Sequence, residues 1–473
     1  MVKQATYSSC IPAPRQVRLA TIVTAFRRDD EVQSSISRFA ASSLPKAGHR
    51  LLVIDNGRTL HAGSFDWGAI IPNPNLGGAG GFTRGLLEAK AAAGFTHALF
   101  MDDDASCHFE SIDKTIACLN WAKDDALAIS GSMLLLEQPW IQHEAGARFH
   151  SAFGLVSVSH NLDLREKVNV LANEAGGRVD YGAWWFFAFP LKHAKNYAFP
   201  FFVRGDDQQF SRANTFSIAT MNGIACWQQR FDDKATPSVD YLAHRADFVI
   251  GLMRVPDSFF GRVKLVRQMA RPIFREALAF RYGFAHARCD AVDDVFKGPA
   301  FFEQNLSALP RLAQLKAKYA SFYAADIQLD AKSAGSIKKW RNREGLWRLA
   351  STITIGGHLL PNALLSERSV IIPFLHHSGS GFLRKNVVYY SPRVQRGFVV
   401  KKSLPQLLGV TWRYLGQALK LLTGGAELRK RYQERLPYLQ SEEFWRRHLE
   451  LPKAEAIEQH SDTSGSQVPV QAV

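Results

Sequence analysis

The chain has 473 residues, too long for one compact core, so two or three structural units are expected. Hydrophobic residues make up 46% and charged residues 21%, which is typical of a globular chain rather than a disordered one. The five cysteines form no C-x-x-C pair, so neither a zinc site nor a disulfide framework is expected, and a reducing compartment is indicated. We also expect no signal peptide and no membrane span, because no apolar segment is long enough.

The net charge of +15 is unevenly distributed along the chain. Residues 251–473 carry 34 Lys and Arg against 18 Asp and Glu, whereas the first 250 residues carry 24 against 25. This asymmetry predicts an anionic partner for the second half, either a membrane or a nucleic acid.

The first hundred residues alternate between strand and helix patterns. A strand rich in β-branched residues is predicted over 18–26, followed by a helix to about Ala41. Two shorter strands are predicted over 51–54 and 69–72, and a helix over 86–93. This alternation predicts a parallel, nucleotide-binding sheet.

The residues before that last helix form a glycine-rich run over 77–85. Glycines ahead of a helix let backbone N–H groups approach phosphate oxygens. The run matches neither the Walker pattern nor the dinucleotide fingerprint. A tight turn packed closely on the sheet is therefore an equally good interpretation.

A short apolar run over 97–101 ends in three carboxylates, Asp102, Asp103 and Asp104. Ligand sites in open α/β sheets lie at the carboxyl ends of strands, so we expect this triplet at the rim of the sheet. Hard oxygen ligands of this kind suit Mg²⁺ or Mn²⁺ together with substrate phosphates. The alternative is a solvated acidic turn or a helix N-terminus.

Trp184 and Trp185 are predicted to lie in a strand, where neighbouring side chains face opposite sides. One ring could line a cleft and hold a sugar, while the alternative is that both rings belong to the core. A second apolar segment ends in Asp206 and Asp207, ahead of a predicted helix. A second acidic strand end could accept a proton during group transfer, although helix capping is the alternative.

These motifs, in this order, resemble the inverting GT-A glycosyltransferases of family two. The resemblance is strongest to the galactofuranosyltransferases, including those that polymerise mycobacterial galactan, and it covers about residues 17–250. It rests on the segment from Asn73 through the glycine run to Arg84, the Asp triplet, the tryptophan pair and Gly205-Asp206-Asp207. It implies an α/β fold of the GT-A type, with a Rossmann-like nucleotide-binding mixed sheet flanked by helices.

The resemblance also implies a role for each site residue. Donor-binding residues would be Thr24, Arg27 and Asp55 on the uridine side, Asn75 beside the diphosphate, and Arg84, Asp102 and Asp103. Asp207 would be the general base that deprotonates the acceptor hydroxyl. The acceptor and sugar side would be formed by Trp184, Trp185 and Asp206, and the metal would be held by Asp102, Asp104 and Gln228.

The sequence departs from the family at the expected metal ligand. The family has a metal-binding His in a Trp-His context, whereas this chain has Trp227-Gln228. An amide oxygen is a weaker ligand than imidazole for Mn²⁺, so the dependence on Mn²⁺ or Mg²⁺ is open. The polymerising relatives also carry an N-terminal β-rich domain ahead of the catalytic sheet.

We expect a lead-in over residues 1–16, a catalytic domain over 17–255, a mainly helical basic domain over 256–454 and a disordered tail over 455–473. In the helical domain, the apolar spacing over 404–422 predicts a helix that, with basic residues 429–431, could lie on an anionic bilayer. The alternative is that this helix packs on its own domain or on another subunit.

The leading hypothesis is an inverting transferase that moves galactofuranose from UDP-galactofuranose to a hydroxyl of a lipid-linked or polysaccharide glycan. The expected partners are the UDP-sugar donor, the glycan acceptor, an anionic membrane surface and a possible second copy, with no nucleic acid. The expected location is cytoplasmic, at the inner face of the cell membrane. The alternatives are a nucleic-acid-binding protein that uses the basic half, and a noncatalytic glycan-binding relative.

Overall fold

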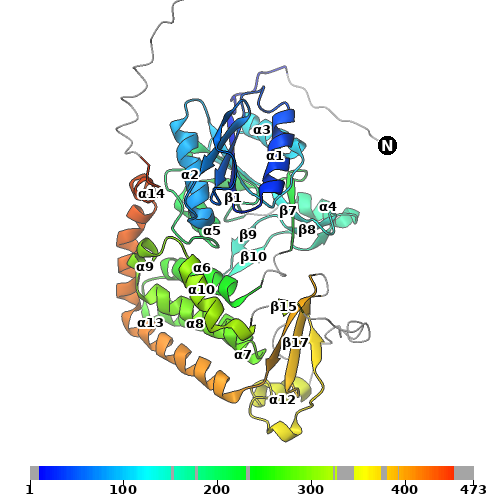
Figure 1. The fold of residues 1–473 in the computed structure, drawn as a ribbon, viewed down its shortest axis with the longest axis vertical. Coiled ribbons are helices and arrows are strands. Elements are labelled where there is room, and N and C mark those ends of the chain that lie inside the picture. The colour runs from blue at the N-terminus through cyan, green and yellow to red at the C-terminus, as the bar shows by residue number, and fades with distance from the viewer. Residues whose placement is uncertain are drawn as a thin grey trace, which may run out of the picture.

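The structure is a computed structural model that describes residues 10–150, 154–175, 179–230, 235–322, 325–326, 346–373, 381–391 and 394–451. The expected tail over 455–473 lies outside the described residues. A layered α/β part built mainly from the first half of the chain sits above a helical part and a small sheet, and one long helix runs along the side (Figure 1).

The centre of the α/β part is a mixed eight-stranded sheet. Its strands, from edge to edge, are β13 (Ser217–Ala219), β6 (Leu127–Ser130), β12 (Phe187–Pro190), β5 (His97–Asp102), β1 (Leu19–Ala25), β2 (Arg50–Asp55), β4 (Gly68–Pro72) and β3 (Gly63–Phe65). Strands β5, β1, β2 and β4 are parallel, whereas β12 and β3 run antiparallel to their neighbours. The predicted α/β fold class, with a mixed sheet flanked by helices, is confirmed.

Alternation along β1 sends its side chains into two separate cores. Leu19 and Val23 pack with α1 (Asp29–Ala41) and α3 (Phe109–Trp121). Ala20 and Ile22 pack with α2 (Gly77–Ala91) on the other face. Helices therefore cover both sides of the sheet, as near-continuous apolar strands require.

The glycine-rich run is helical from its first residue, so the predicted start of this helix at residue 86 is wrong. The reason is close packing of α2 on β1. A Cβ at Gly81 would lie 2.2 Å from Cγ2 of Thr24, and one at Gly85 would lie 2.2 Å from Cγ2 of Ile22. The glycines therefore allow close packing on the sheet, as the alternative interpretation expected, although they do so within a helix and not in a tight turn.

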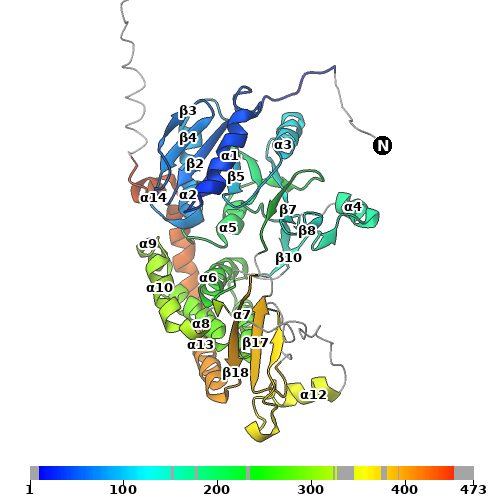
Figure 2. The same ribbon diagram turned by 45° about the vertical axis from the view of Figure 1, so that its right-hand side comes forward.

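A second sheet adjoins the first and carries the order β11 (Leu162–Asp163), β8 (Ile141–Glu144), β7 (Ser132–Leu135) and β14 (Ala225–Gln228). A hairpin of β9 (Ala147–Phe149) and β10 (Leu155–Ser157) and the short helix α4 (Lys167–Glu174) lie beside it (Figure 2). The helix α5 (Asp206–Ala213) lies below the main sheet, facing the helical part (Figure 1).

The second half of the chain is mainly helical, as expected. Its α-helices are α6 (Pro237–Arg254), α7 (Phe259–Leu278), α8 (Tyr282–Phe296), α9 (Pro299–Gln304), α10 (Leu309–Lys318), α12 (Leu346–Ile353), α13 (Leu404–Leu439) and α14 (Glu442–His448). It also contains a small sheet that the sequence did not predict. The strands of this sheet are β15 (Ala325–Asp326), β18 (Arg396–Lys401), β17 (Asn386–Ser391) and β16 (Val370–Ile372).

The helix predicted over 404–422 continues to residue 439. Beyond it, α14 returns to the α/β part, where the Trp445 indole N–H donates to the carbonyl of Ala198 at 2.8 Å. One apolar cluster runs from β1 and α2 through α6, α7 and α8 to Trp445. The expected division at residue 255 therefore falls inside a continuous core. Over the described residues, every helix is too short or too polar to cross a bilayer.

Candidate active site

Five of the expected site residues lie at one edge of the main sheet because parallel strands end together. In the strand register, Thr24 lies opposite Asp102 and Ala25 lies opposite Asp55. The Thr24 hydroxyl is buried and has no hydrogen-bond partner among the described residues. The register thus brings Thr24, Asp55 and the Asp triplet to the edge where ligands bind in open α/β sheets.

The Asp triplet is held by groups that directly follow β1. The Phe26 amide donates to Oδ2 of Asp103 at 3.1 Å. The Arg28 guanidinium lies 3.1 Å from Oδ2 of Asp104 and 3.6 Å from Oδ1 of Asp103. Arg28 was not among the predicted site residues. Its signal was a pair of arginines directly after the first strand, at the edge where an acidic cluster was expected.

Gln228, at the end of β14 in the second sheet, contacts the Asp triplet. Its side-chain amide donates to Asp102 at 3.3 Å and also to Asp104. Its carbonyl Oε1 is buried and has no hydrogen-bond partner among the described residues. Rotation of the amide would exchange its NH₂ and oxygen, giving two carboxylates and one carbonyl oxygen. This set of hard oxygen ligands fits Mg²⁺ or Mn²⁺.

The second acidic pair opens α5. Gly205 precedes it with a φ of +78°, a conformation that favours glycine, and the Gln208 amide donates to Oδ1 of Asp207 at 2.7 Å. Asp206 faces the start of α2, because a Cβ at Gly78 would lie 3.1 Å from its Oδ2. Asp206 and Asp207 can therefore lie in the first turn of α5 and also belong to the acidic cluster.

The Asp triplet at the end of β5 and the acidic pair at the start of α5 act on each other electrostatically. Among the described residues no strand lies between β12 and α5, so the predicted strand end at Asp206 is wrong. Burial raises the pKa of Asp102 to about 7, with Asp104, Asp103 and also Asp207 adding to the increase. Burial raises the pKa of Asp207 to about 6, and the pKa of Asp206 is raised well above its usual range, by burial and then by Asp207. Charges influence each other this strongly only at short range. The two acidic ends therefore converge on one site.

Glu144 and Tyr181 extend this site on the side of Asp207. The Tyr181 hydroxyl donates to Oε1 of Glu144 at 3.3 Å, and the Ser157 hydroxyl donates to Oε2 at 2.5 Å. The carboxylate of Glu144 raises the pKa of Asp207, while Arg204 lowers it. No role was predicted for Glu144, because the strand pairing that brings it here is not visible in the local pattern.

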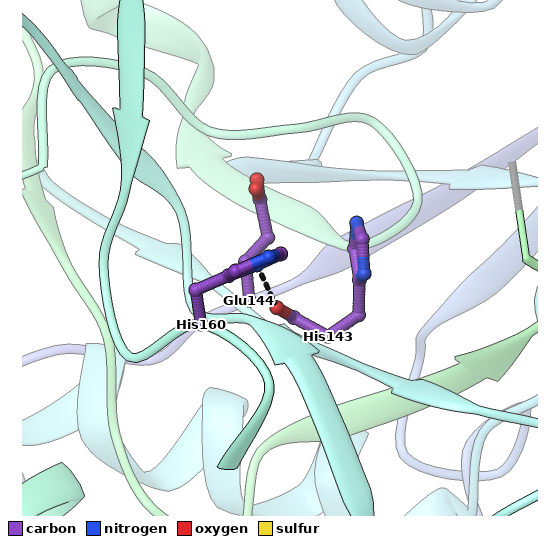
Figure 3. A group of neighbouring side chains, drawn as sticks. All are labelled: His143, Glu144 and His160. Atoms are coloured by element: carbon purple, nitrogen blue, oxygen red, sulfur yellow. Dashed lines mark hydrogen bonds between the residues drawn. The ribbon is translucent and has the colours of Figure 1, made fainter. Parts of the chain in front are cut away.

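Glu144 also belongs to a group of potential metal ligands with His143 and His160, whose ligand atoms lie within 4.8 Å of one another (Figure 3). His160 Nδ1 lies 2.7 Å from the carbonyl of His143, and its Nε2 lies 2.9 Å from the amide of Asn161. Both oxygens of Glu144 already accept hydrogen bonds. The group is thus a possible metal site whose ligand atoms are largely engaged by the protein.

The expected donor-binding residues differ in burial and in their contacts. Asp55 is fully buried and accepts the amides of Gly57 at 2.9 Å and Leu60 at 2.8 Å, so it holds the loop after β2. Asn75 accepts the Gly77 amide at 3.1 Å and thereby caps α2. Arg27 is exposed, with a φ of +54°.

The side chains of Arg84, Trp184 and Trp185 are engaged in contacts within the protein. Arg84 pairs with Glu88 at 2.6 Å, about 10 Å along α2 from its first residue, given a rise of about 1.5 Å per residue. Trp184 and Trp185 lie in a turn ahead of β12 rather than in a strand, and both are buried. Trp184 packs against Phe100, and Trp185 donates to the carbonyl of Gly131 at 2.9 Å. The alternative that both rings belong to the core is the one observed.

Comparison with solved structures gives weak global similarity. The mannosyltransferase PcManGT from Pyrobaculum calidifontis, in complex with GDP-Man and Mn²⁺, aligns with 89% of this chain and 91% of its own length at 12% identity and a TM-score of 0.34. TarS 1–349 from S. aureus, in complex with UDP-GlcNAc, aligns with 64% of this chain and 88% of its own length at 13% identity and a TM-score of 0.35. These scores carry no argument about function.

Comparison of sequences is more informative, although no family model matches the chain. The galactofuranosyltransferase GlfT2 of Mycobacterium tuberculosis is 24% identical over 491 aligned positions, covering 95% of this chain and 76% of that protein. GlfT2 of Mycolicibacterium smegmatis is 25% identical over 350 positions, covering 67% of this chain and 53% of that protein. This similarity confirms the resemblance to galactofuranosyltransferases that the motifs indicated, and it supports the prediction that the chain is a glycosyltransferase.

Proposed function

We propose that this protein is an inverting transferase that moves galactofuranose from UDP-galactofuranose to a hydroxyl of a lipid-linked or polysaccharide glycan. The observation that carries the proposal is the placement of Asp102, at the end of β5, and Asp207, in the first turn of α5, near enough for the charge of Asp207 to add to the increase in the pKa of Asp102. Transfer from a nucleotide sugar needs one group that manages phosphate charge and another that accepts a proton, and the site offers both. The similarity to GlfT2 supports the choice of sugar.

Asp207 is the proposed general base. With a pKa of about 6 it is mainly ionised at neutral pH and still basic enough to take the proton of an acceptor hydroxyl. The deprotonated oxygen attacks the anomeric carbon from the face opposite the departing UDP. Burial and then the neighbouring Asp207 raise the pKa of Asp206, and its carboxyl group is proposed to contact the acceptor.

The donor side is proposed to consist of Thr24, Arg27, Asp55, Asn75, Arg84, Asp102 and Asp103. Asp102, Asp104 and Gln228 would hold Mn²⁺ or Mg²⁺. Such an ion, when bound, neutralises charge on the leaving diphosphate. Arg28 neutralises part of the same acidic cluster through its contacts with Asp103 and Asp104. Trp184 and Trp185, although buried, would form the wall behind the sugar and acceptor.

The acceptor is proposed to be presented at the cytoplasmic face of the cell membrane, with the basic second half directed towards anionic lipid. Self-association of the chain is also proposed, since the second half offers contact surface beyond the site. The membrane contact rests on the charge asymmetry of the sequence.

The test of the base is Asp207→Asn, which keeps the shape of the side chain and removes its basicity. Sugar transfer should fall by about 100- to 10,000-fold, the usual contribution of a general base. Binding of UDP, measured by calorimetry, should remain unchanged, because Asp207 acts on the acceptor side. Transfer at the wild-type rate would remove Asp207 from this role.

The test of the donor is a comparison of UDP-galactofuranose, UDP-galactopyranose and UDP-glucose with the purified protein, read by mass spectrometry with and without Mn²⁺. We expect transfer from UDP-galactofuranose alone. Binding of a glycan without transfer from any donor would instead favour a noncatalytic glycan-binding relative.

A further inference from the structure

The first half of α13 exposes a continuous apolar stripe. Leu408, Trp412, Leu415 and Leu419 are separated by four, three and four residues, so they share one face of the helix. Their exposed fractions are 59, 79, 51 and 63%. No Asp or Glu occurs between Leu404 and Ala426. Exposed apolar surface on this scale marks a contact site.

The neighbouring helix α7 exposes a basic stripe. Lys264, Arg267 and Arg271 recur at helical spacing and are exposed, and the acidic residue of this helix, Glu276, is buried. Phe259 and Phe260, at the start of the same helix, are 56% and 82% exposed.

The two stripes belong to helices that pack directly on each other. The Tyr414 hydroxyl donates to the carbonyl of Val266 at 3.2 Å, and Arg262 donates to the carbonyl of Leu422 at 3.1 Å. Because Arg262 precedes Val266 whereas Leu422 follows Tyr414, the helices run antiparallel. Phe259 and Phe260 therefore lie towards the Leu419 end of the apolar stripe.

The basic cluster that the sequence suggested, residues 429–431, is only partly exposed. Arg429 is half-buried and donates to the carbonyls of Leu252 at 3.2 Å and of Val255. Lys430 and Arg431 are exposed, and Arg431 donates to the carbonyl of Lys297 at 3.0 Å. Further exposed positive charge lies beside α13 on α7.

We propose that the α7–α13 surface (Phe259, Phe260, Lys264, Arg267, Arg271, Leu408, Trp412, Leu415 and Leu419) binds an anionic lipid bilayer, with its apolar side chains in the interface and its basic side chains on lipid phosphates. Aromatic and leucine side chains next to Lys and Arg are the composition of interfacial membrane helices. A second copy fits less well, because a symmetric contact through this surface would oppose positive charges. The proposal deepens the membrane contact of the proposed function but does not depend on the sugar donor.

The test is co-sedimentation of the full chain with vesicles of phosphatidylcholine, with or without phosphatidylglycerol. We expect binding to the anionic vesicles and little binding to the neutral ones. Arg267→Gln/Arg271→Gln should weaken partitioning by about fivefold for each basic side chain removed. Trp412→Ser/Leu415→Ser should weaken it comparably and abolish any blue shift of tryptophan fluorescence on binding.

The control is Lys46→Gln/Lys123→Gln, which makes the same change in net charge at exposed positions of the α/β part. The control should bind vesicles like the wild type. Equal loss in the control, or unchanged binding in both test variants, would overturn the proposal. So would a wild-type oligomer that dissociates in Trp412→Ser/Leu415→Ser, because this surface would then join two copies. UDP-sugar transfer to a water-soluble acceptor should stay unchanged in all variants, which separates failure here from failure of the proposed function.

Discussion

At the scale of single residues, the environment of Asp207 determines when it can accept a proton. Burial holds its pKa at about 6, above the usual value of a carboxyl group, and Glu144 contributes to this increase. The ionised form is the active form of a base. Sugar transfer should therefore decline as the pH falls through about 6.

Glu144→Gln provides a test of this dependence. Removing the neighbouring negative charge lowers the pKa of Asp207, so the acidic limb of the pH–rate profile should move to lower pH. The amide keeps the acceptor oxygen for the Tyr181 hydroxyl, so the hairpin should be retained. A limb that stays in place, or that moves to higher pH, would contradict the assignment of this limb to Asp207.

Arg28 affects how strongly the triplet binds a cation. Its guanidinium competes for Asp104, and its side chain is about one-third exposed, so solvent screens the pair. Arg28→Gln should therefore tighten Mn²⁺ binding by up to about fivefold, the range of a partly exposed ion pair. Calorimetric titration with Mn²⁺ measures this effect, with Arg84→Gln as the control, since Arg84 pairs with Glu88 instead. Weaker binding in Arg28→Gln would show that Arg28 supports the ion.

Among residues, the sequence predicted the acidic cluster well and its surroundings poorly. Asp102 carried a signal because it follows an apolar strand, and Asp207 carried one because it follows an apolar segment, although that segment does not form a strand. Glu144 and Tyr181 carried none, since they reach the site through tertiary packing of a second sheet. Trp184 was assigned to a strand by its apolar neighbours, although a turn places both tryptophans in the core.

At the scale of elements, α2 depends on glycine for its contact with β1. Gly81→Ala would place a methyl group 2.2 Å from Thr24 Cγ2, so the helix or the strand must shift. We expect a loss of about 1–3 kcal/mol in the free energy of unfolding, as for other overpacked cores, together with weaker UDP binding. Chemical denaturation and calorimetry measure the two effects.

Gly416→Ala is the matched control. This glycine lies within α13 and has open space around it, so alanine should stabilise the helix by up to about 1 kcal/mol. Equal stability of the two variants would show that the contact between α2 and β1 is loose. The sequence predicted this helix but not its start, because propensity disfavours glycine in helices and only the packing explains its presence.

At the scale of the whole molecule, α14 joins the last part of the described chain to the first. Trp445 is fully buried beneath α2 and donates to Ala198. Trp445→Ala should lower the free energy of unfolding by about 3–5 kcal/mol, the usual cost of removing a large buried ring. Trp445→Phe, which keeps an aromatic ring, should cost less. A small effect of Trp445→Ala would mean that α14 is only loosely attached.

The charge asymmetry and the helical character of the second half were visible in the sequence. The small sheet of β15 to β18 was not, because β15 and β16 are only two and three residues long and β15 pairs with β18, which lies far later in the chain. The contact of α14 with the α/β part was also not predicted, since contacts between residues several hundred positions apart leave no local pattern. Residue 255 therefore looked like a boundary although the core continues across it.

The position of Trp445 has a consequence for synthesis on the ribosome. The sheet and α2 emerge first, yet the indole that covers α2 is added hundreds of residues later. Until then the growing polypeptide must keep an uncovered apolar face on its α/β part, a condition that favours chaperone binding. A fragment released at residue 255 would keep that face permanently uncovered, and it should aggregate rather than yield a smaller working enzyme.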